Sequence, residues 1–235
     1  PVSGTISSNT TWAATDSPFQ VTGHVTVASG ATLTIEPGVT VKFDSGKALV
    51  VEGTLVVRGT SSEKITFTAS SETPETDAWG FIKFTDSSVD AVFDGAGDYT
   101  GGSVLEHCTV EYGNGIGDGA ILAIDASPFI NYCTFQNNSL TRTHESEAGQ
   151  QDHTANTLKF DLAGGTLKIT NNTTIGQHYG LYVNSIDSVE ISGNTVAGDH
   201  SGIGIYVHAC RPAIVTGNKV TENTENAIGT GIHIY

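Results

Sequence analysis

The chain repeats one pattern four times: AILAIDASPFINYCTFQNN (residues 120–138), TLKFDLAGGTLKITNNTTIG (157–176), YGLYVNSIDSVEISGNTVAG (179–198) and IGIYVHACRPAIVTGNKVTEN (203–223). Each copy holds two short strands with a turn between them. Repeats of this size are typical of stacked solenoids. Apolar residues alternate at Leu181 and Val183, then at Val189 and Ile191. This two-residue period predicts half-buried strands and not helices.

Equivalent residues in successive turns of such a solenoid lie in register, about 4.8 Å apart. Matching the second strands predicts one inward polar column and one inward apolar column. The polar column is Cys108, Cys133, Thr173, Asn194 and Asn218, and the apolar column is Val110, Phe135, Ile175, Val196 and Val220. We expect the polar column to bond from turn to turn as a side-chain ladder. Cys108 and Cys133 are expected to be stacked, buried thiols, although a separation of about one turn is also compatible with a disulfide.

Three N-terminal segments have the same strand texture: GATLTIEPGVTVKF (30–43), LVVEGTLVVRGTSSEKITFTA (49–69) and WGFIKF (79–84). They resemble the opening of right-handed parallel β-helix repeat proteins secreted by bacteria and archaea. The resemblance implies an all-β, right-handed parallel β-helix, an extracellular or cell-surface location and frequent contact with polysaccharide. It implies no single activity, because similar folds serve polysaccharide lyases, glycoside hydrolases, phage tailspikes, adhesins and surface-layer components.

We therefore expect a single solenoid domain over residues 1–235. Its N-terminal cap would be residues 1–30, its turns residues 31–235, and its surface insertions would lie near 86–102 and 139–156. The last segment, GTGIHIY (229–235), starts a further turn and stops before a second strand. The expectation is an incomplete C-terminal turn, a longer parent chain, and self-association through the open edge.

The amino-acid composition limits the classes of binding partner that the protein can have. The net charge is −15, with only 10 Lys and Arg against 25 Asp and Glu, which argues against nucleic acid and anionic membrane surfaces. The sequence has no apolar run near the ~20 residues of a membrane span. Three cysteines are too few for a disulfide framework. Cations, neutral glycans or protein partners fit better.

The first strands of the turns predict two outward columns. One column is Lys83, Ala123, Lys159, Tyr182, Tyr206 and His233; the next is Thr85, Asp125, Asp161, Asn184, His208 and Tyr235. Aromatic rings beside hydrogen-bonding groups suit sugars. The candidate ligand-binding residues are Lys83, Lys159, Tyr182, Asn184, Tyr206, His208 and His233, with the two insertions as groove walls. Alternatively, the face is polar only because it is solvated.

Asp125 and Asp161 fall in neighbouring turns of one predicted column, so their carboxylates would lie within about 5–6 Å. That pair suits the acid and nucleophile of a retaining glycosidase, a Ca²⁺ site, or a hydrated pair without a role. Lys159 or His208 is a candidate base for β-elimination from a uronate.

Other metal candidates lie in turns and loops. Asp94 and Asp98, in the turn DGAGD (94–98), are further Ca²⁺ candidates, as is the turn NGIGDG (114–119). The 139–156 loop holds residue types that bind transition metals, although a solvated loop is the default interpretation. These residues are His144, Glu145, Glu147, Asp152 and His153.

The sequence thus favours a secreted or cell-surface β-helix domain with a structural, assembly or glycan-contacting role and no catalysis. The alternative is a polysaccharide lyase or glycoside hydrolase using Asp125, Asp161, Lys159 and His208. Ice binding is a third option, disfavoured because the threonines look scattered among columns.

Overall fold

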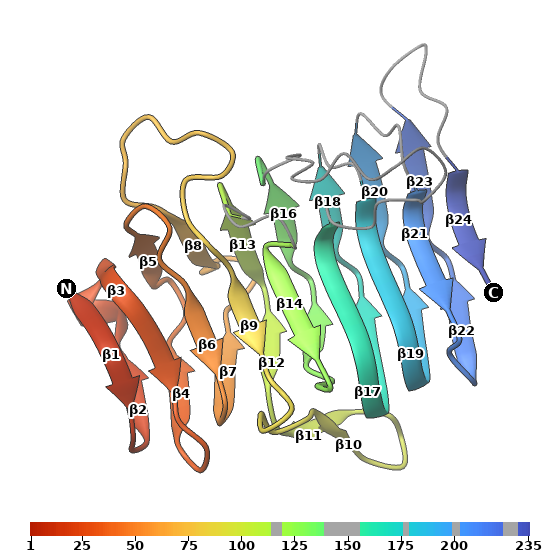
Figure 1. Ribbon diagram of the computed structural model, residues 1–235, viewed down its shortest axis with the longest axis horizontal. Helices are drawn as coiled ribbons and strands as arrows, with labels where there is room; N and C mark the ends of the chain where they lie inside the picture. The colour runs from red at the N-terminus through yellow and green to blue at the C-terminus, as the bar shows by residue number, and fades with distance from the viewer. Residues whose placement is uncertain (114–118, 139–155, 176–178, 199–202, 223–229) are drawn as a thin grey trace, which may run out of the picture.

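The computed structural model describes residues 1–113, 119–138, 156–175, 179–198, 203–222 and 230–235. In these residues the chain forms a parallel β-solenoid of about eight turns (Figure 1), apart from a short 3₁₀ helix, η1 (Ala14–Asp16), and one antiparallel hairpin. The turns build three parallel sheets around one core. The predicted all-β solenoid is confirmed.

The first sheet faces the viewer in Figure 1 and carries the site described below. Its strands are β1 (Val2–Ile6), the end of β3 (Phe19–Val27), β6 (Leu49–Val51), β9 (Ile82–Phe84), β14 (Ile121–Ile124), the first parts of β17 (Asn156–Thr170) and β19 (Tyr179–Ser192), β21 (Ile203–His208) and β24 (Thr230–Ile234).

The second and third sheets complete each turn. The second is β2 (Thr10–Trp12), β4 (Thr32–Ile35), β7 (Thr54–Arg58), β12 (Val104–Glu106), β15 (Phe129–Asn131), the later parts of β17 and β19, and β22 (Ala213–Thr216). The third is the start of β3, β5 (Thr40–Phe43), β8 (Ile65–Ala69), β13 (Cys108–Glu111), β16 (Thr134–Gln136), β18 (Thr173–Ile175), β20 (Thr195–Gly198) and β23 (Lys219–Glu222).

Alternate residues of every sheet point into the core, as the two-residue period predicts. Phe84, Phe160 and Val183 are fully buried examples. The segment expected to cap the N-terminal end continues the ladders, because Gly4 pairs with Val25 and Thr10 with Leu33. Trp12, buried and stacked on Phe19 at 4.9 Å, lies near this end of the core.

A polar ladder runs along the corner between the second and third sheets, but its members differ by one residue from the prediction. Thr173 pairs with Thr134 and Thr195, so the ladder position next to it belongs to Asn172. The observed column is Cys108, Cys133, Asn172, Asn194 and Asn218. Each ladder residue follows a residue in the left-handed region, with φ between 51° and 67°: His107, Tyr132, Asn171, Gly193 and Gly217.

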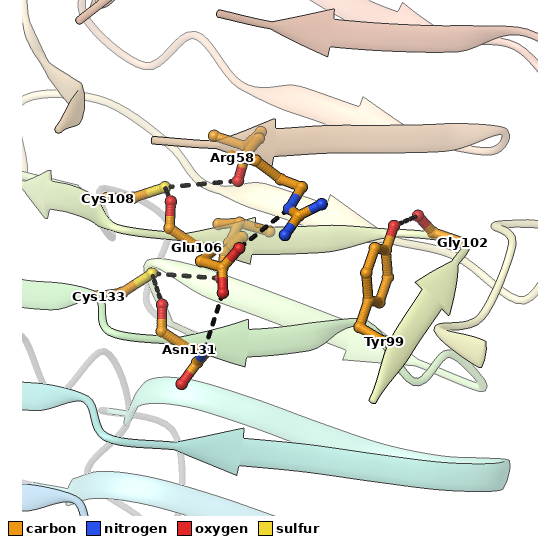
Figure 2. Close-up of polar contacts among 9 residues, drawn as sticks. Arg58, Tyr99, Gly102, Glu106, Cys108, Asn131 and Cys133 are labelled. Carbon is orange, nitrogen blue, oxygen red and sulfur yellow. Dashed lines mark hydrogen bonds and ion pairs between the residues drawn. The ribbon is translucent and has the colours of Figure 1, made fainter. Parts of the chain in front are cut away.

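Every side chain of the ladder reaches a carbonyl of the preceding turn. The thiols of Cys108 and Cys133 lie 4.0 Å from Val57 O and 3.4 Å from Leu105 O, with nearer acceptors in their own turn at Glu106 O and Asn131 O, each at 3.3 Å (Figure 2). The amides of Asn172, Asn194 and Asn218 donate at 2.8–3.0 Å to Ile130 O, Ile169 O and Ile191 O. Their oxygens also accept backbone N–H groups of the preceding turn. The three cysteines of the chain are free thiols.

The same shift changes two other expectations. Thr174, not Ile175, pairs with Phe135 and Val196 in the apolar column, and Ile175 is exposed.

The third sheet also carries an unbroken outward file of threonines, so the expectation that the threonines are scattered among columns is wrong there. The file is Thr40, Thr66, Thr109, Thr134, Thr173 and Thr195. The next outward column holds charged Lys42 and Glu111, which interrupts any uniform hydroxyl surface.

Candidate functional site

A strip of polar and aromatic side chains covers the outer face of β17, β19, β21 and β24 in the first sheet. The backbone register stacks Lys159, Tyr182, Tyr206 and His233 in one column. Asp161, Asn184, His208 and Tyr235 form the next column. These eight residues are called the polar strip. From β17 onward, both columns match the prediction.

Hydrogen bonds join three members of the strip across three turns. Asn184 donates its Nδ2–H to Asp161 Oδ1 at 2.7 Å. His208 Nδ1 lies 2.7 Å from Asn184 Oδ1. Asp161 and Asn184 are half-buried and His208 is exposed, so the chain of bonds runs from the sheet surface toward solvent.

The rings of the strip form one cluster. Tyr182 and Tyr206 stack at 5.0 Å, His233 meets Tyr206 edge-on at 5.7 Å, and Tyr235 lies 4.3 Å from His233. Tyr206 is only 8% exposed, whereas Tyr235 is 69% exposed. Tyr206 was expected to stack on a sugar, but its faces are covered. Among the three tyrosines of the strip, Tyr235 is the exposed one.

Burial also sets the chemistry of the phenols. Burial raises the pKa of Tyr182 to about 12, with the nearby Asp161 carboxylate and Tyr206 adding to the effect. Burial, with a contribution from Tyr235, likewise raises the pKa of Tyr206. Both phenols therefore stay protonated at neutral pH.

Toward β14 the strip departs from the prediction by one residue. Leu122 pairs with Lys159 and Ile124 with Asp161, so Ala123 and Asp125 are not members of the two columns. Asp125 follows the strand in the left-handed region (φ 51°), and its N–H donates to Asp161 O at 2.9 Å. Asp125 and Asp161 therefore do not stack in one outward column. Lys83 pairs with Leu122, which separates it from Lys159.

The calcium candidates Asp94 and Asp98 close the turn of the hairpin formed by β10 (Val92–Phe93) and β11 (Tyr99–Gly101). Asp94 Oδ1 accepts the N–H groups of Ala96 and Asp98, both at 2.9 Å. These bonds hold the pKa of the Asp94 carboxyl below its usual range. Across the described ranges, no group of three or more His, Cys, Asp or Glu side chains is arranged to hold a metal.

Several other metal candidates lie outside the described residues. They are His144, Glu145, Glu147, Asp152 and His153, with the rest of the 139–155 segment, and residues 114–118 of the second Gly/Asp turn.

The 86–102 insertion was expected to wall the strip, but it packs over the second sheet (Figure 1). Phe93 and Tyr99 contact Phe129 of β15 at 5.3 and 5.9 Å. The Lys168 ammonium of β17 lies 4.4 Å from the centre of the Phe93 ring and donates to Gly97 O at 2.9 Å. Aromatic packing thus draws the hairpin away from the strip.

A second polar cluster lies beside this hairpin, and the sequence interpretation missed it. Arg58 Nε donates to Glu106 Oε2 and Asn131 Nδ2 to Glu106 Oε1, each at 3.0 Å (Figure 2). Arg58 also lies 5.4 Å from the centre of the Tyr99 ring. Aligning the outward positions of the second strands would have found this column, since Arg58, Glu106 and Asn131 are in register. Its groups pair with one another and support the hairpin.

Comparisons with known proteins identify the family of the chain. Searches of curated proteins and of solved structures each gave no match. No helix in the described part of the chain is long and apolar enough to cross a membrane. A family model described as "Pectate-lyase like beta helix domain" matches residues 4–200, which include the strip residues of β17 and β19. The chain therefore belongs to the family of pectate-lyase-like β-helix domains.

Proposed function

We propose that the protein is a non-catalytic β-helix domain of the cell surface or extracellular space that contacts glycans through the polar strip. Family membership suggests a carbohydrate-related function. The observation that carries the proposal is the bonded series Asp161, Asn184 and His208 beside the exposed ring of Tyr235. Polar groups that are already oriented lose little freedom on binding, and an exposed tyrosine offers both an apolar ring and a hydroxyl.

Two features favour binding over catalysis. Asp161 pairs with Ile124 across the ladder, so the register does not stack the carboxylates of Asp125 and Asp161, the arrangement that suggested a glycosidase. The phenols of Tyr182 and Tyr206 hold their protons and do not serve as bases. A surface that only contacts a glycan needs neither group.

The proposal is tested by measuring affinity for a panel of neutral, amino-bearing and acidic oligosaccharides by calorimetry. Tyr235→Ala is expected to weaken binding about tenfold or more, because exposed aromatic anchors dominate such contacts. Tyr132→Ala is the matched control. Tyr132 is 48% exposed and stacks on His107 at 4.9 Å, at a corner away from the strip. Equal losses in the two variants, or no binding to any sugar, would contradict the proposal.

A lyase is the second candidate, favoured by His208. The imidazole is exposed and its Nδ1 is engaged by Asn184, which leaves Nε2 to accept a proton. The test is the absorbance of unsaturated products and the release of reducing ends from each polymer, with and without Ca²⁺. Products that disappear in His208→Gln would replace the non-catalytic proposal; no product from any polymer supports it.

Self-association is a further proposed role, favoured by the apolar residues of β24. Ile232 and Ile234 align with the fully buried Ile205 and Val207, yet they are 40% and 52% exposed. Sedimentation over a range of concentrations is expected to show association that Ile234→Lys weakens. A monomer at the highest concentration would contradict this role.

A further inference from the structure

The bonds between Asp161, Asn184 and His208 have only one chemically consistent direction. A carboxylate only accepts hydrogen bonds, so Asn184 must turn its NH₂ group toward Asp161 Oδ1, 2.7 Å away. The amide oxygen of Asn184 then faces His208 Nδ1, also at 2.7 Å. Because that oxygen is only an acceptor, Nδ1 must carry the hydrogen.

We infer that Asn184 is a positioning residue that holds neutral His208 as its Nδ1–H tautomer, and that the polar strip consequently selects neutral or amino-bearing sugars over uronates. The selectivity rests on the proposed glycan contact. The tautomer assignment does not, because it follows from the two hydrogen bonds alone.

The selectivity follows from what the strip presents to solvent. Nε2 of His208 is left as a hydrogen-bond acceptor on an exposed side chain. Asp161, the neighbour of Asn184 in the same column, adds a carboxylate. Sugar hydroxyls and ammonium groups donate hydrogen bonds to such acceptors. The carboxylate of a uronate does not donate, and it is repelled by Asp161 and by a chain of net charge −15.

The composition of the strip agrees with this selectivity. Arginine provides the bidentate contacts that carboxylates favour, and none of the eight residues of the strip is an arginine. Arg58 lies on the second sheet and is paired with Glu106. Lys159 is the lysine among the eight residues of the strip, and Asp161 lies two positions after it on the same strand. The strip therefore offers a uronate little positive charge that is not offset by Asp161.

The tautomer is measured by ¹⁵N NMR of the histidine rings of the whole chain at pH 8, where imidazoles are mostly neutral. His208 is expected to show a protonated Nδ1 and an unprotonated Nε2. In Asn184→Leu it is expected to shift toward the Nε2–H form that free histidine favours. An Nε2–H tautomer in the wild-type protein overturns the inference, whatever the protein binds.

The selectivity is measured at the same pH with uncharged and uronic oligosaccharides of equal length. The wild-type protein is expected to prefer the uncharged ligand, and Asn184→Leu to weaken that binding about tenfold. Gln136→Leu is the matched control, because Gln136 makes a comparable amide–carboxylate bond with Glu111 (2.8 Å) on the third sheet. Uronates that bind as tightly as uncharged sugars, or an unchanged affinity in Asn184→Leu, would overturn the selectivity. If no sugar binds, the proposed function and the selectivity fail, while the NMR result still decides the role of Asn184.

Discussion

Replacing Asn194 with alanine is expected to destabilise the solenoid by about 3–6 kcal/mol. Asn194 Oδ1 accepts the backbone N–H of Asn172 at 2.9 Å and its side-chain amide at 3.0 Å. Asn194 Nδ2 donates to Ile169 O at 2.8 Å. Asn194 Nδ2 also lies 2.9 Å from Asn218 Oδ1 and 3.2 Å from Ser192 O, in partly buried contacts. Alanine removes all of these contacts, including the three in the buried interior. A buried polar group that loses its partner costs about 1–3 kcal/mol, so three such losses sum to about 3–9 kcal/mol. Partial relaxation keeps the total in the lower half of this sum, about 3–6 kcal/mol.

The assay is urea unfolding followed by circular dichroism. Thr195→Ala is the control: Thr195 is the next residue, half-buried and outward, and its hydroxyl makes no hydrogen bond within the residues described, so its change should stay within about 0.5 kcal/mol. Asn194→Cys should lose an intermediate amount, because the thiols of Cys108 and Cys133 occupy equivalent positions and still reach a carbonyl of the preceding turn. A loss below about 1 kcal/mol in Asn194→Ala would refute the ladder as a source of stability.

Three further predictions concern buried groups. The folded protein keeps the phenolic proton of Tyr182 after the unfolded chain has lost it, so stability should fall as pH rises from 10 to about 12; urea unfolding of Tyr182→Phe should lack this component. Thr174→Val should raise the free energy of unfolding by about 1 kcal/mol, since the buried Thr174 hydroxyl has no hydrogen-bond partner; a loss in the same urea assay would count against this reasoning. Cys108 and Cys133 should resist alkylation at pH 8 until urea is added, because both are buried and burial raises the pKa of Cys108; rapid labelling of the native protein would contradict their placement.

The repeats predicted the fold and much of the strip because apolar and polar residues alternate clearly in the strands that carry the strip. In YGLYVN (179–184) and IGIYVH (203–208), apolar residues alternate with polar or aromatic residues. Only one strand register buries these apolar residues, and that register fixes the outward columns that contain Tyr182 and Asn184.

The prediction failed by one residue where the alternation disappears. ILAID (121–125) is apolar at four successive positions, so its pattern allows the predicted alignment that turns Asp125 outward. The structure instead places Ile121 and Ala123 inward. In NNTTI (171–175), paired asparagines and threonines allow two alignments. The ladder selects Asn172, whose amide reaches the carbonyl of the preceding turn, at the cost of burying Thr174.

Contacts between segments that are far apart in the sequence could not be predicted from the local alternation of apolar and polar residues. The packing of Phe93 and Tyr99 on Phe129 decides where the 86–102 insertion lies, and no periodicity encodes it. The covering of Tyr206 by neighbouring rings likewise depends on how side chains of three turns fill one space.

Chemical-shift mapping during titration with uncharged oligosaccharides tests the central claim most directly, because it reports both whether a sugar binds and where. The account predicts that the ring signals of His208 and Tyr235 and the amide signals of Asn184 shift together and saturate. Shifts confined to the third sheet or to the β10–β11 hairpin, or no shift with any sugar, would contradict it.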